Sequence, residues 1–421
     1  MDATGDDDFD VVETGISKFN GNRSNPRCAT SLGRVLNFDM LLETPLGSSH
    51  LLAQLGGDRL FMLNASAAEL WYCFQMSTDA QVERPLVQKL MVEYGLSEAD
   101  ANEQVTSMLT HWHQSGLLHD GSLNSVSDWV ILPPFLETPV SITFIVQMAG
   151  LDFGMWIDDQ QLTEPLRVLL SSMLRDGSPR LAHQLALTGF ASQWQLYVNG
   201  ELSSTGQGLD NALTCVLHTL IDLACQAEDR LLVVHGAGVK LADDRGLLLI
   251  APGGSGKTTL ATALNAQGFS LLSDDVVPVT LEGKLLGLGT PICLKSGSWE
   301  VLAKLRPDIM STSKMARFDQ SVRYLPPLGQ PCTEPLALGM LIFPRYQPDS
   351  LPQCNALSPE VALQHIIEAE AVLRNLSQVK LDALATWVSS VPAYAISYPD
   401  LNSALKLVRL LIDKLPSSAK P

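Results

Sequence analysis

The stretch that most constrains the fold of this chain runs from residue 247 to 260 and reads Leu-Leu-Leu-Ile-Ala-Pro-Gly-Gly-Ser-Gly-Lys-Thr-Thr-Leu. An apolar strand, a glycine-rich turn and a helix follow one another here, as a phosphate-binding loop requires. Small residues let backbone N–H groups curl around an anion, and the helix N-terminus adds partial positive charge. Lys257 can then neutralise the β- and γ-phosphate oxygens, and the Thr258 hydroxyl can bind Mg²⁺.

One position departs from the pattern G-x-x-x-x-G-K-[ST], because Ala251 stands where the first glycine belongs. The alternative is an ordinary glycine-rich turn between a strand and a helix. The Lys-Thr pair at the right place after a strand favours the nucleotide site, so we expect a nucleotide and Mg²⁺ to bind here. The residues expected to bind them are Gly253, Gly254, Ser255, Gly256, Lys257, Thr258 and Thr259.

A pair of acids follows in Leu271-Leu-Ser-Asp-Asp-Val-Val277, with Asp274 seventeen residues after Lys257. Phosphoryl transfer needs Mg²⁺ to neutralise charge and a group that accepts the proton of the attacking hydroxyl. Adjacent side chains of a regular strand face opposite ways, so both acids can serve only at a strand end. The alternative is one functional acid and one solvated neighbour.

His235 lies in Leu231-Leu-Val-Val-His-Gly-Ala-Gly238, at the end of an apolar run and before glycines that permit close backbone approach. An imidazole near Asp274 would orient that acid or help to deprotonate a hydroxyl. The alternative is a histidine that is satisfied within the core.

Composition excludes several classes of function. The chain has 28 Lys+Arg against 45 Asp+Glu, a net charge of −17, which disfavours nucleic-acid binding. Its seven cysteines are scattered and show no C-x-x-C pair, which indicates reduced thiols. The first ten residues carry five acids and no base, unlike a secretory signal, and no apolar run reaches the roughly 18 residues of a membrane span. We therefore expect a cytoplasmic protein with no membrane or nucleic-acid partner.

The length of 421 residues predicts two or three domains. Two short strands around Gly56-Gly57-Asp58 and three helical patterns give a small winged-helix-like α+β domain near the N-terminus. Strand and helix patterns then alternate, as in α/β proteins, and end with helices near residues 362–376 and 403–415. The predicted parts are a partly disordered acidic segment (1–44), the small domain (45–118), a linker (119–135) and an α/β domain (136–421) with a leading subdomain (136–229).

Three motifs together resemble the catalytic domain of HPr kinases, and more closely the HPr-kinase-related proteins of peptide-modification gene clusters. They are His235-Gly, the loop 251–259 and Leu272-Ser-Asp-Asp275. Residues 291–298 and 341–346 also fit, so the resemblance covers about residues 140–370. It implies the P-loop fold shared with phosphoenolpyruvate carboxykinases and ATP-dependent phosphorylation of a hydroxyl side chain.

The same resemblance implies roles for individual residues. Asp274 is then the base and His235 its neighbour, while Lys257 acts on the phosphates and Asp275 joins Thr258 at the metal. The opposite division of labour between the two acids stays open. Lys295 ends a strand where a cation can meet phosphate. The C-terminal signature that accompanies phosphorolysis in HPr kinases is not present, so that second activity is not expected.

The segments 62–71 (Met-Leu-Asn-Ala-Ser-Ala-Ala-Glu-Leu-Trp) and 115–118 (Ser-Gly-Leu-Leu) resemble PqqD, and the resemblance covers about residues 45–118. PqqD-like domains recognise the leader of a ribosomally made precursor peptide by adding it as an extra strand against the third helix. The alternative is an ordinary winged-helix domain that binds nucleic acid or packs structurally, and the negative charge argues against the first of these.

Together these features predict a kinase that phosphorylates Ser, Thr or Tyr in a precursor peptide held by its first domain. The alternatives are a small-molecule phosphotransferase and a non-catalytic nucleotide-binding adaptor that presents a peptide to another enzyme. Both Lys257-Thr258 and Asp274-Asp275 favour catalysis. A homo-oligomer is compatible with all three.

Overall fold

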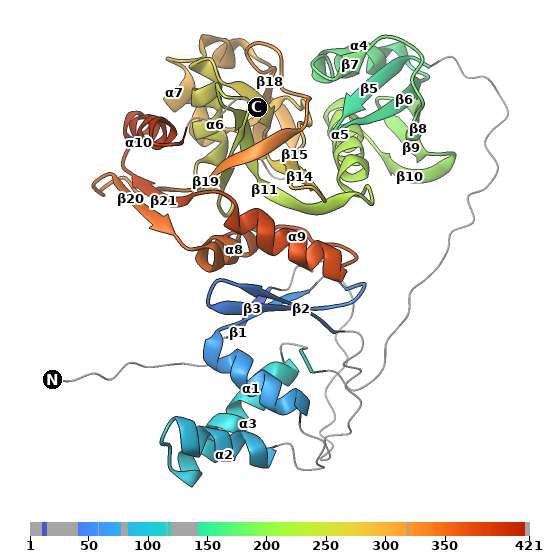
Figure 1. Cartoon of the computed structure of the whole chain (residues 1–421). Coiled ribbons are helices and arrows are strands. Elements are labelled where there is room, and N and C mark those ends of the chain that lie inside the picture. The colour runs from blue at the N-terminus through green and yellow to red at the C-terminus, as the bar shows by residue number, and fades with distance from the viewer. Residues whose placement is uncertain are drawn as a thin grey trace. The chain divides into compact units, whose positions relative to one another are not determined.

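The computed structural model describes residues 11–14, 41–57, 59–76, 83–114, 117–118, 142–317 and 320–416 (Figure 1). The chain divides into two compact units. The N-terminal unit comprises Met1–Trp129 together with Leu373–Ser389, and the larger unit comprises Val130–Val372 and Ser390–Pro421. The predicted linker 119–135 lies outside the described residues.

The N-terminal unit contains an antiparallel sheet and three helices. The strand order is β1 (Val11–Thr14), β4 (Leu60–Leu63), β3 (Ser49–Gln54) and β2 (Leu41–Leu46). The helices are α1 (Ala65–Met76), α2 (Glu83–Glu93) and α3 (Glu98–Gln114).

Helix α1 starts at a polar cap, and aromatic side chains of α1 and α3 meet in the core of this unit. Asn64 Oδ1 accepts a hydrogen bond from the Ala67 N–H at 2.8 Å at the start of α1, a regular N-cap arrangement. The indole ring of Trp71 on α1 lies edge-on to that of Trp112 on α3, with ring centroids 5.2 Å apart. Leu52 and Phe61 on the sheet belong to the same buried cluster, so this face of the sheet packs against the helices.

The opposite face of the same sheet is also buried. The strand register places Leu42 beside Ala53 and Ala53 beside Leu60, and all three are buried. Helix α9 (Gln378–Ser389) packs against β2, and the Gln378 side chain donates a hydrogen bond to the Glu43 carbonyl at 2.8 Å. A helix from the last tenth of the sequence therefore belongs to the N-terminal unit, whereas the sequence analysis assigned that stretch to the α/β domain.

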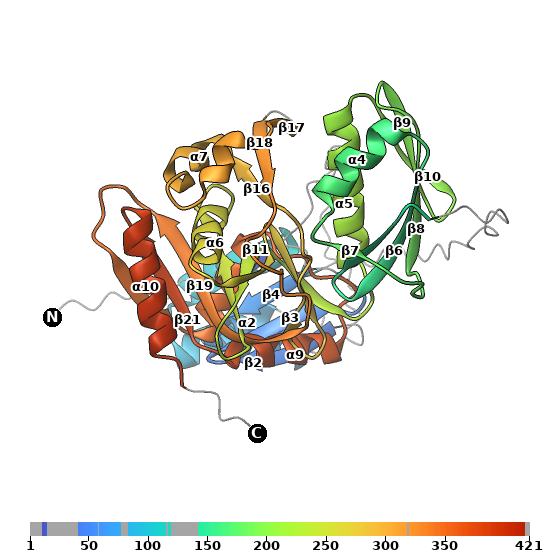
Figure 2. The ribbon, with the colours of Figure 1, turned by 90° about the horizontal axis from the view of Figure 1, so that it is seen from above.

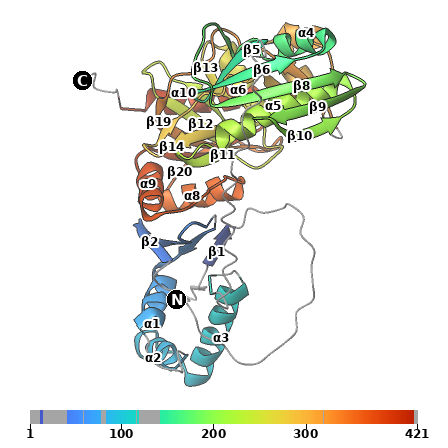
Figure 3. The same cartoon turned by 90° about the vertical axis from the view of Figure 1, so that its right-hand side faces the viewer.

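The larger unit begins with a six-stranded sheet, seen in Figure 3. Its strand order is β10 (Glu201–Gly206), β9 (Gln193–Val198), β8 (His183–Phe190), β6 (Leu151–Ile157), β5 (Phe144–Met148) and β7 (Leu174–Arg175). Helices α4 (Gln160–Leu169) and α5 (Leu209–Cys225) contact β6 and β5, respectively, and share one buried cluster with the sheet. Helix α4 is amphipathic, because Leu162, Leu166 and Leu169 are buried at helical spacing.

An eight-stranded sheet forms the rest of the core. The order is β12 (Gly246–Ile250), β11 (Arg230–Lys240), β14 (Val276–Thr280), β15 (Lys284–Leu285), β19 (Leu336–Tyr346), β21 (Ala393–Tyr398) and β20 (Gln353–Leu357), with β13 (Ser270–Ser273) paired to β11. Because β19 also pairs in parallel with β12, these pairings close on themselves. Helices α6 (Lys257–Ala266) and α10 (Leu401–Asp413) belong to the same buried cluster as this sheet (Figure 2).

Smaller elements surround this sheet. They are a three-stranded sheet in the order β16 (Ile292–Lys295), β18 (Gln320–Leu325) and β17 (Met315–Arg317), the helices α7 (Ser296–Leu302) and α8 (Pro359–Glu368), and the 3₁₀ helix η2 (Pro307–Ser311). The mixture of strands and helices confirms the α/β class. None of the helices in the described part of the chain has the length and apolar character needed to span a membrane.

The prediction of a single helix near residues 362–376 was wrong. Helix α8 ends at Glu368, and Glu370 adopts a left-handed backbone with φ of 63°. A non-glycine residue in this region interrupts a right-handed helix, and the chain resumes as α9 after Ser377. The periodicity of apolar residues did not reveal this break.

Residues 373–389 are expected to be required for a stable N-terminal unit. A fragment of residues 41–118 exposes the sheet face that contains Leu42, Ala53 and Leu60. Exposure of buried aliphatic side chains costs roughly 1.5–3 kcal/mol each, so this fragment should melt at lower temperature than the same fragment fused to residues 373–389 by a flexible linker. Thermal unfolding monitored by circular dichroism tests this. Equal melting temperatures would contradict the role of α9.

Candidate active site

The glycine-rich segment between β12 and α6 adopts a conformation that its glycines permit. Gly254 and Gly256 have φ of 82° and 92°, in the left-handed region. A Cβ on Gly256 would also lie 3.2 Å from the Tyr398 hydroxyl. Glycine is therefore favoured at residue 256 by backbone conformation and by space.

Lys257 is the first residue of α6 and is 7% exposed. Its ammonium group donates hydrogen bonds to the carbonyl oxygens of Ala251 and, at 3.1 Å, of Pro252, both in the preceding loop. Burial lowers the pKa of this lysine, and the carboxylates of Asp275 and Asp274 oppose that shift. The cation is thus held at the base of the loop, at a helix N-terminus.

The turn between β13 and β14 carries the two acids that the sequence singled out. Asp275 has φ of 82°, and its carbonyl accepts a hydrogen bond from the Gly236 N–H at 3.0 Å. The left-handed backbone of Asp275 lies in the turn where the chain leaves β13 and enters β14. Both carboxyl groups line the same cavity, as the strand-end argument required.

Asp274 is 4% exposed. Its Oδ2 accepts a hydrogen bond from the Cys293 N–H at 3.1 Å, whereas its buried Oδ1 makes no hydrogen bond within normal geometric limits to any described residue. Burial, followed by the charge of Asp275, raises the pKa of Asp274 to about 7, although the Cys293 N–H and the Thr258 hydroxyl favour the ionised form. A carboxyl group with this pKa exchanges a proton near neutral pH.

The carboxylate that His235 faces is Asp275, not Asp274 as the sequence analysis expected. His235 Nε2 lies 3.5 Å from Asp275 Oδ1, and Arg317 Nη2 lies 3.4 Å from Asp275 Oδ2. Burial and the nearby charge of Lys257 lower the pKa of His235, with Asp275 opposing this. The imidazole is therefore mostly neutral at pH 7.

Arg317 was missed by the sequence analysis, because nothing in its local pattern distinguishes it from a surface arginine. It ends the short strand β17, whose Ala316 N–H donates to Asp210 Oδ2 at 2.8 Å. Asp210 is in the first turn of α5, so the six-stranded part of the unit positions a cation in the site. Arg317 also contacts the Cys293 Sγ at 3.2 Å.

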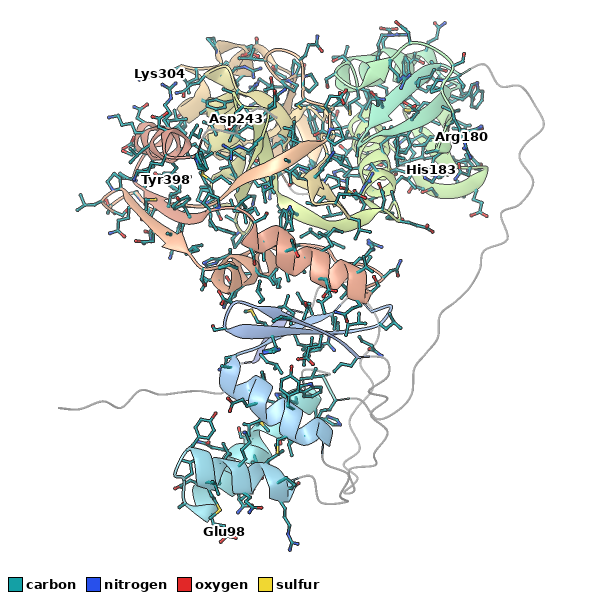
Figure 4. The ribbon with its side chains drawn as sticks, viewed as in Figure 1. Glu98, Arg180, His183, Asp243, Lys304 and Tyr398 are labelled. Carbon is teal, nitrogen blue, oxygen red and sulfur yellow. The ribbon has the colours of Figure 1, made fainter. Side chains whose placement is uncertain are left out.

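These groups line one cavity of about 530 Å³. Lys257, Lys295 and Arg317 place three cations in its wall, although the whole chain carries a net charge of −17. Tyr346 and Tyr398 also line it, and their ring centroids are 6.2 Å apart. Tyr398 is labelled in Figure 4. Tyr346 lies in the sequence segment 341–346 that resembled the kinase family, whereas Tyr398 carries no sequence signal.

The residues present fit a nucleotide with a divalent cation. The loop offers backbone N–H groups and a lysine, and the unpartnered Oδ1 of Asp274 is available for a proton or a metal-bound ligand. In the described residues, no three His, Cys, Asp or Glu side chains gather into a metal site. Asp274 and Asp275 in the cavity wall offer the one or two carboxylates through which proteins bind Mg²⁺ while substrate phosphates complete the shell.

Asp274 is expected to destabilise the folded protein as pH rises. Because its folded pKa is about 7 against an ordinary value of 3.8, the folded state binds more protons between these values, so stability falls as pH increases through that window. Asp274→Asn should stabilise the folded protein by a margin that grows from pH 5 to pH 8, towards an upper limit of roughly 4 kcal/mol in the free energy of unfolding, and the melting temperature should rise accordingly. Asp349→Asn is the control, since Asp349 is exposed and does not line the cavity. A margin for Asp274→Asn that is equal at both pH values would contradict the raised pKa.

Comparison with known proteins identifies the family of the N-terminal domain. Residues 49–118 match the family model of PqqD, described as coenzyme PQQ synthesis protein D, which confirms the resemblance of the N-terminal domain. The HPr(Ser) kinase/phosphatase from Coxiella burnetii is a structural neighbour at 14% sequence identity, covering 43% of this chain and 94% of that chain, with a TM-score of 0.22. At that score the neighbour says nothing about the residues of the candidate site. No curated protein matches the chain in sequence.

Proposed function

We propose that this protein is an ATP-dependent kinase that phosphorylates a Ser, Thr or Tyr hydroxyl of a ribosomally made precursor peptide. One observation carries the proposal. A glycine-rich loop with Lys257 at a helix N-terminus shares a cavity with Asp274, a buried carboxyl group with a pKa near neutrality and a free oxygen. Phosphate binding and proton acceptance are the two tasks that phosphoryl transfer to a hydroxyl demands.

The nucleotide would bind at the glycine-rich loop. Backbone N–H groups of residues 253–259 and the Lys257 ammonium would hold its phosphates, and Thr258 with Asp275 would hold Mg²⁺. ATP supplies the phosphoryl group, and Mg²⁺ neutralises its charge. Lys295 and Arg317 lie in the wall of the same cavity, where each can stabilise negative charge on the transferred group.

Asp274 is the residue we assign as the base. A general base is most effective when its pKa lies near the working pH, and Asp274 meets this condition. The Cys293 N–H holds one carboxyl oxygen, which leaves the other for the substrate hydroxyl. His235 and Arg317 hold Asp275 from two sides, an arrangement that suits a group with a fixed position at a metal.

The N-terminal unit would supply the peptide. The match of residues 49–118 to PqqD supports this, because such domains take up a leader as an added strand. Attachment of the capture domain to the kinase makes the catalytic encounter intramolecular, at an effective concentration near millimolar for a short linker.

The proposed activity can be tested with the full chain, Mg·[γ-³²P]ATP and synthetic precursor peptides encoded beside its gene. We expect label on the peptide. Label on a small molecule would replace the proposal by a small-molecule phosphotransferase, and nucleotide binding without transfer would indicate the adaptor.

Lys257→Ala is expected to abolish this transfer while the protein remains folded, because it removes a buried cation directed at the phosphates. Lys240→Ala is the control, since the Lys240 ammonium pairs with Asp244 at 2.7 Å near the end of β11, outside the cavity. Turnover near that of the wild type in a folded Lys257→Ala protein would exclude the phosphate-binding role.

Asp274→Asn is expected to lower the rate by at least about a hundredfold with a much smaller change in nucleotide affinity. In the wild type, kcat/KM should rise with pH up to about 7 and then level off, because the base must be deprotonated. The variant should lose this rise in its residual activity. A larger rate loss for Asp275→Asn would reverse the division of labour between the acids.

A further inference from the structure

The strand at the edge of the N-terminal sheet comes from the first residues of the chain itself. Strand β1 pairs antiparallel with β4, with Val11 opposite Leu63 and Thr14 opposite Leu60. β1 ends the strand order, so among the described strands β4 is the one it pairs with. The pairing is not a hairpin, because about 45 residues separate the two strands.

Without β1, β4 would itself be the edge of this sheet. An edge strand presents a row of unpaired N–H and C=O groups that can pair with another extended segment. All four residues of β4, Leu60–Leu63, are buried, so this edge is apolar as well as able to form hydrogen bonds. The sequence of β1, Val-Val-Glu-Thr, is rich in β-branched residues, which suit strands.

We propose that residues 11–14 are an internal occupant of the β4 edge, which an incoming extended peptide must displace. The inference rests on the proposed function to the extent that the displacing ligand is a precursor peptide. The direction of β1 predicts that the ligand also runs antiparallel to β4. The kinase would thus carry a built-in competitor for its own peptide-binding surface.

The competition has a simple thermodynamic form. A ligand that binds only the open edge has its apparent affinity reduced in proportion to the fraction of molecules in which β1 has left. The described pairing of β1 with β4 spans four residue pairs, so a peptide that pairs along the same edge can compete with it. Tethering favours β1 through its high effective concentration.

A direct test uses the chain's own segment as the probe. A fluorescent peptide of residues 8–16 (Asp-Phe-Asp-Val-Val-Glu-Thr-Gly-Ile) is titrated into the full-length protein and into a variant that lacks residues 1–16. We expect the shortened protein to bind at least about tenfold more tightly, with a scrambled peptide as control. Equal binding to both proteins, or binding to neither, would overturn the proposal. Neither ATP nor a precursor peptide is present, so this result is independent of the kinase activity.

Hydrogen exchange gives a second measurement that does not depend on peptide affinity. Removal of residues 1–16 should increase amide exchange in residues 60–63, and the added peptide should restore protection. Melting temperatures close to each other would show that the shortened protein is folded. Unchanged exchange in residues 60–63 would contradict the occupancy of this edge by β1.

Proline substitutions in the full-length protein provide a matched pair. Successive N–H groups of a strand point to opposite sides, so of Val12 and Glu13 one directs its N–H towards β4 and the other away from it. Proline at the inward position removes a ladder hydrogen bond, whereas an edge strand tolerates it at the outward position. We expect one of Val12→Pro and Glu13→Pro to bind the labelled peptide as the shortened protein does. Wild-type behaviour of both would refute the proposal.

Discussion

The candidate site depends on the pairing of one long strand, β11. Its first half pairs with β14, and its second half pairs with β12 and β13. The glycine-rich loop leaves the end of β12, and the two acids lie between β13 and β14. His235 is placed at the midpoint of β11, opposite Val276. The backbone hydrogen bonds of β11 therefore bring together the loop, the acids and the imidazole. Contacts between their side chains are not needed to hold these elements in place.

Burial then sets the chemistry of the groups that β11 brings together. Lys257 and Asp274 are 7% and 4% exposed, and each has its charged form disfavoured by loss of water. Their mutual attraction opposes this effect without removing it. The result is an acid with a pKa near neutrality beside a cation held by loop carbonyls, in a chain whose overall charge would otherwise repel a nucleotide.

In the N-terminal unit, both faces of the sheet and one of its edges are covered by other segments of the chain. Helices α1–α3 cover one face, and α9 packs on β2 at the other. Backbone hydrogen bonds between Gly56 and Leu376 (2.7 Å) and between Leu376 and Gly57 (2.9 Å) attach the later segment to the β3–β4 turn. The β4 edge is covered by β1. Segments distant in sequence thus complete a domain that sequence similarity confines to residues 49–118.

The sequence by itself determined the local elements of the site. Residues 247–260 predict a strand, a glycine-rich turn and a helix, and residues 271–277 predict acids at a strand end, because these signals depend on neighbours in the chain. The same holds for the α/β class, for the PqqD-like domain and for Tyr346, which lies in a segment that matched the kinase pattern.

Only the tertiary structure decided which of these groups meet. It placed His235 beside Asp275 rather than Asp274, since the strand register fixes that distance and no local pattern encodes it. It brought Arg317 into the cavity through a hydrogen bond from its strand to Asp210, more than a hundred residues earlier. It also interrupted the helix expected at 362–376 and moved α9 to the other unit. The buried environment that raises the pKa of Asp274 exists only once these distant segments exclude water, and that is why the sequence could name the acid but not its protonation state.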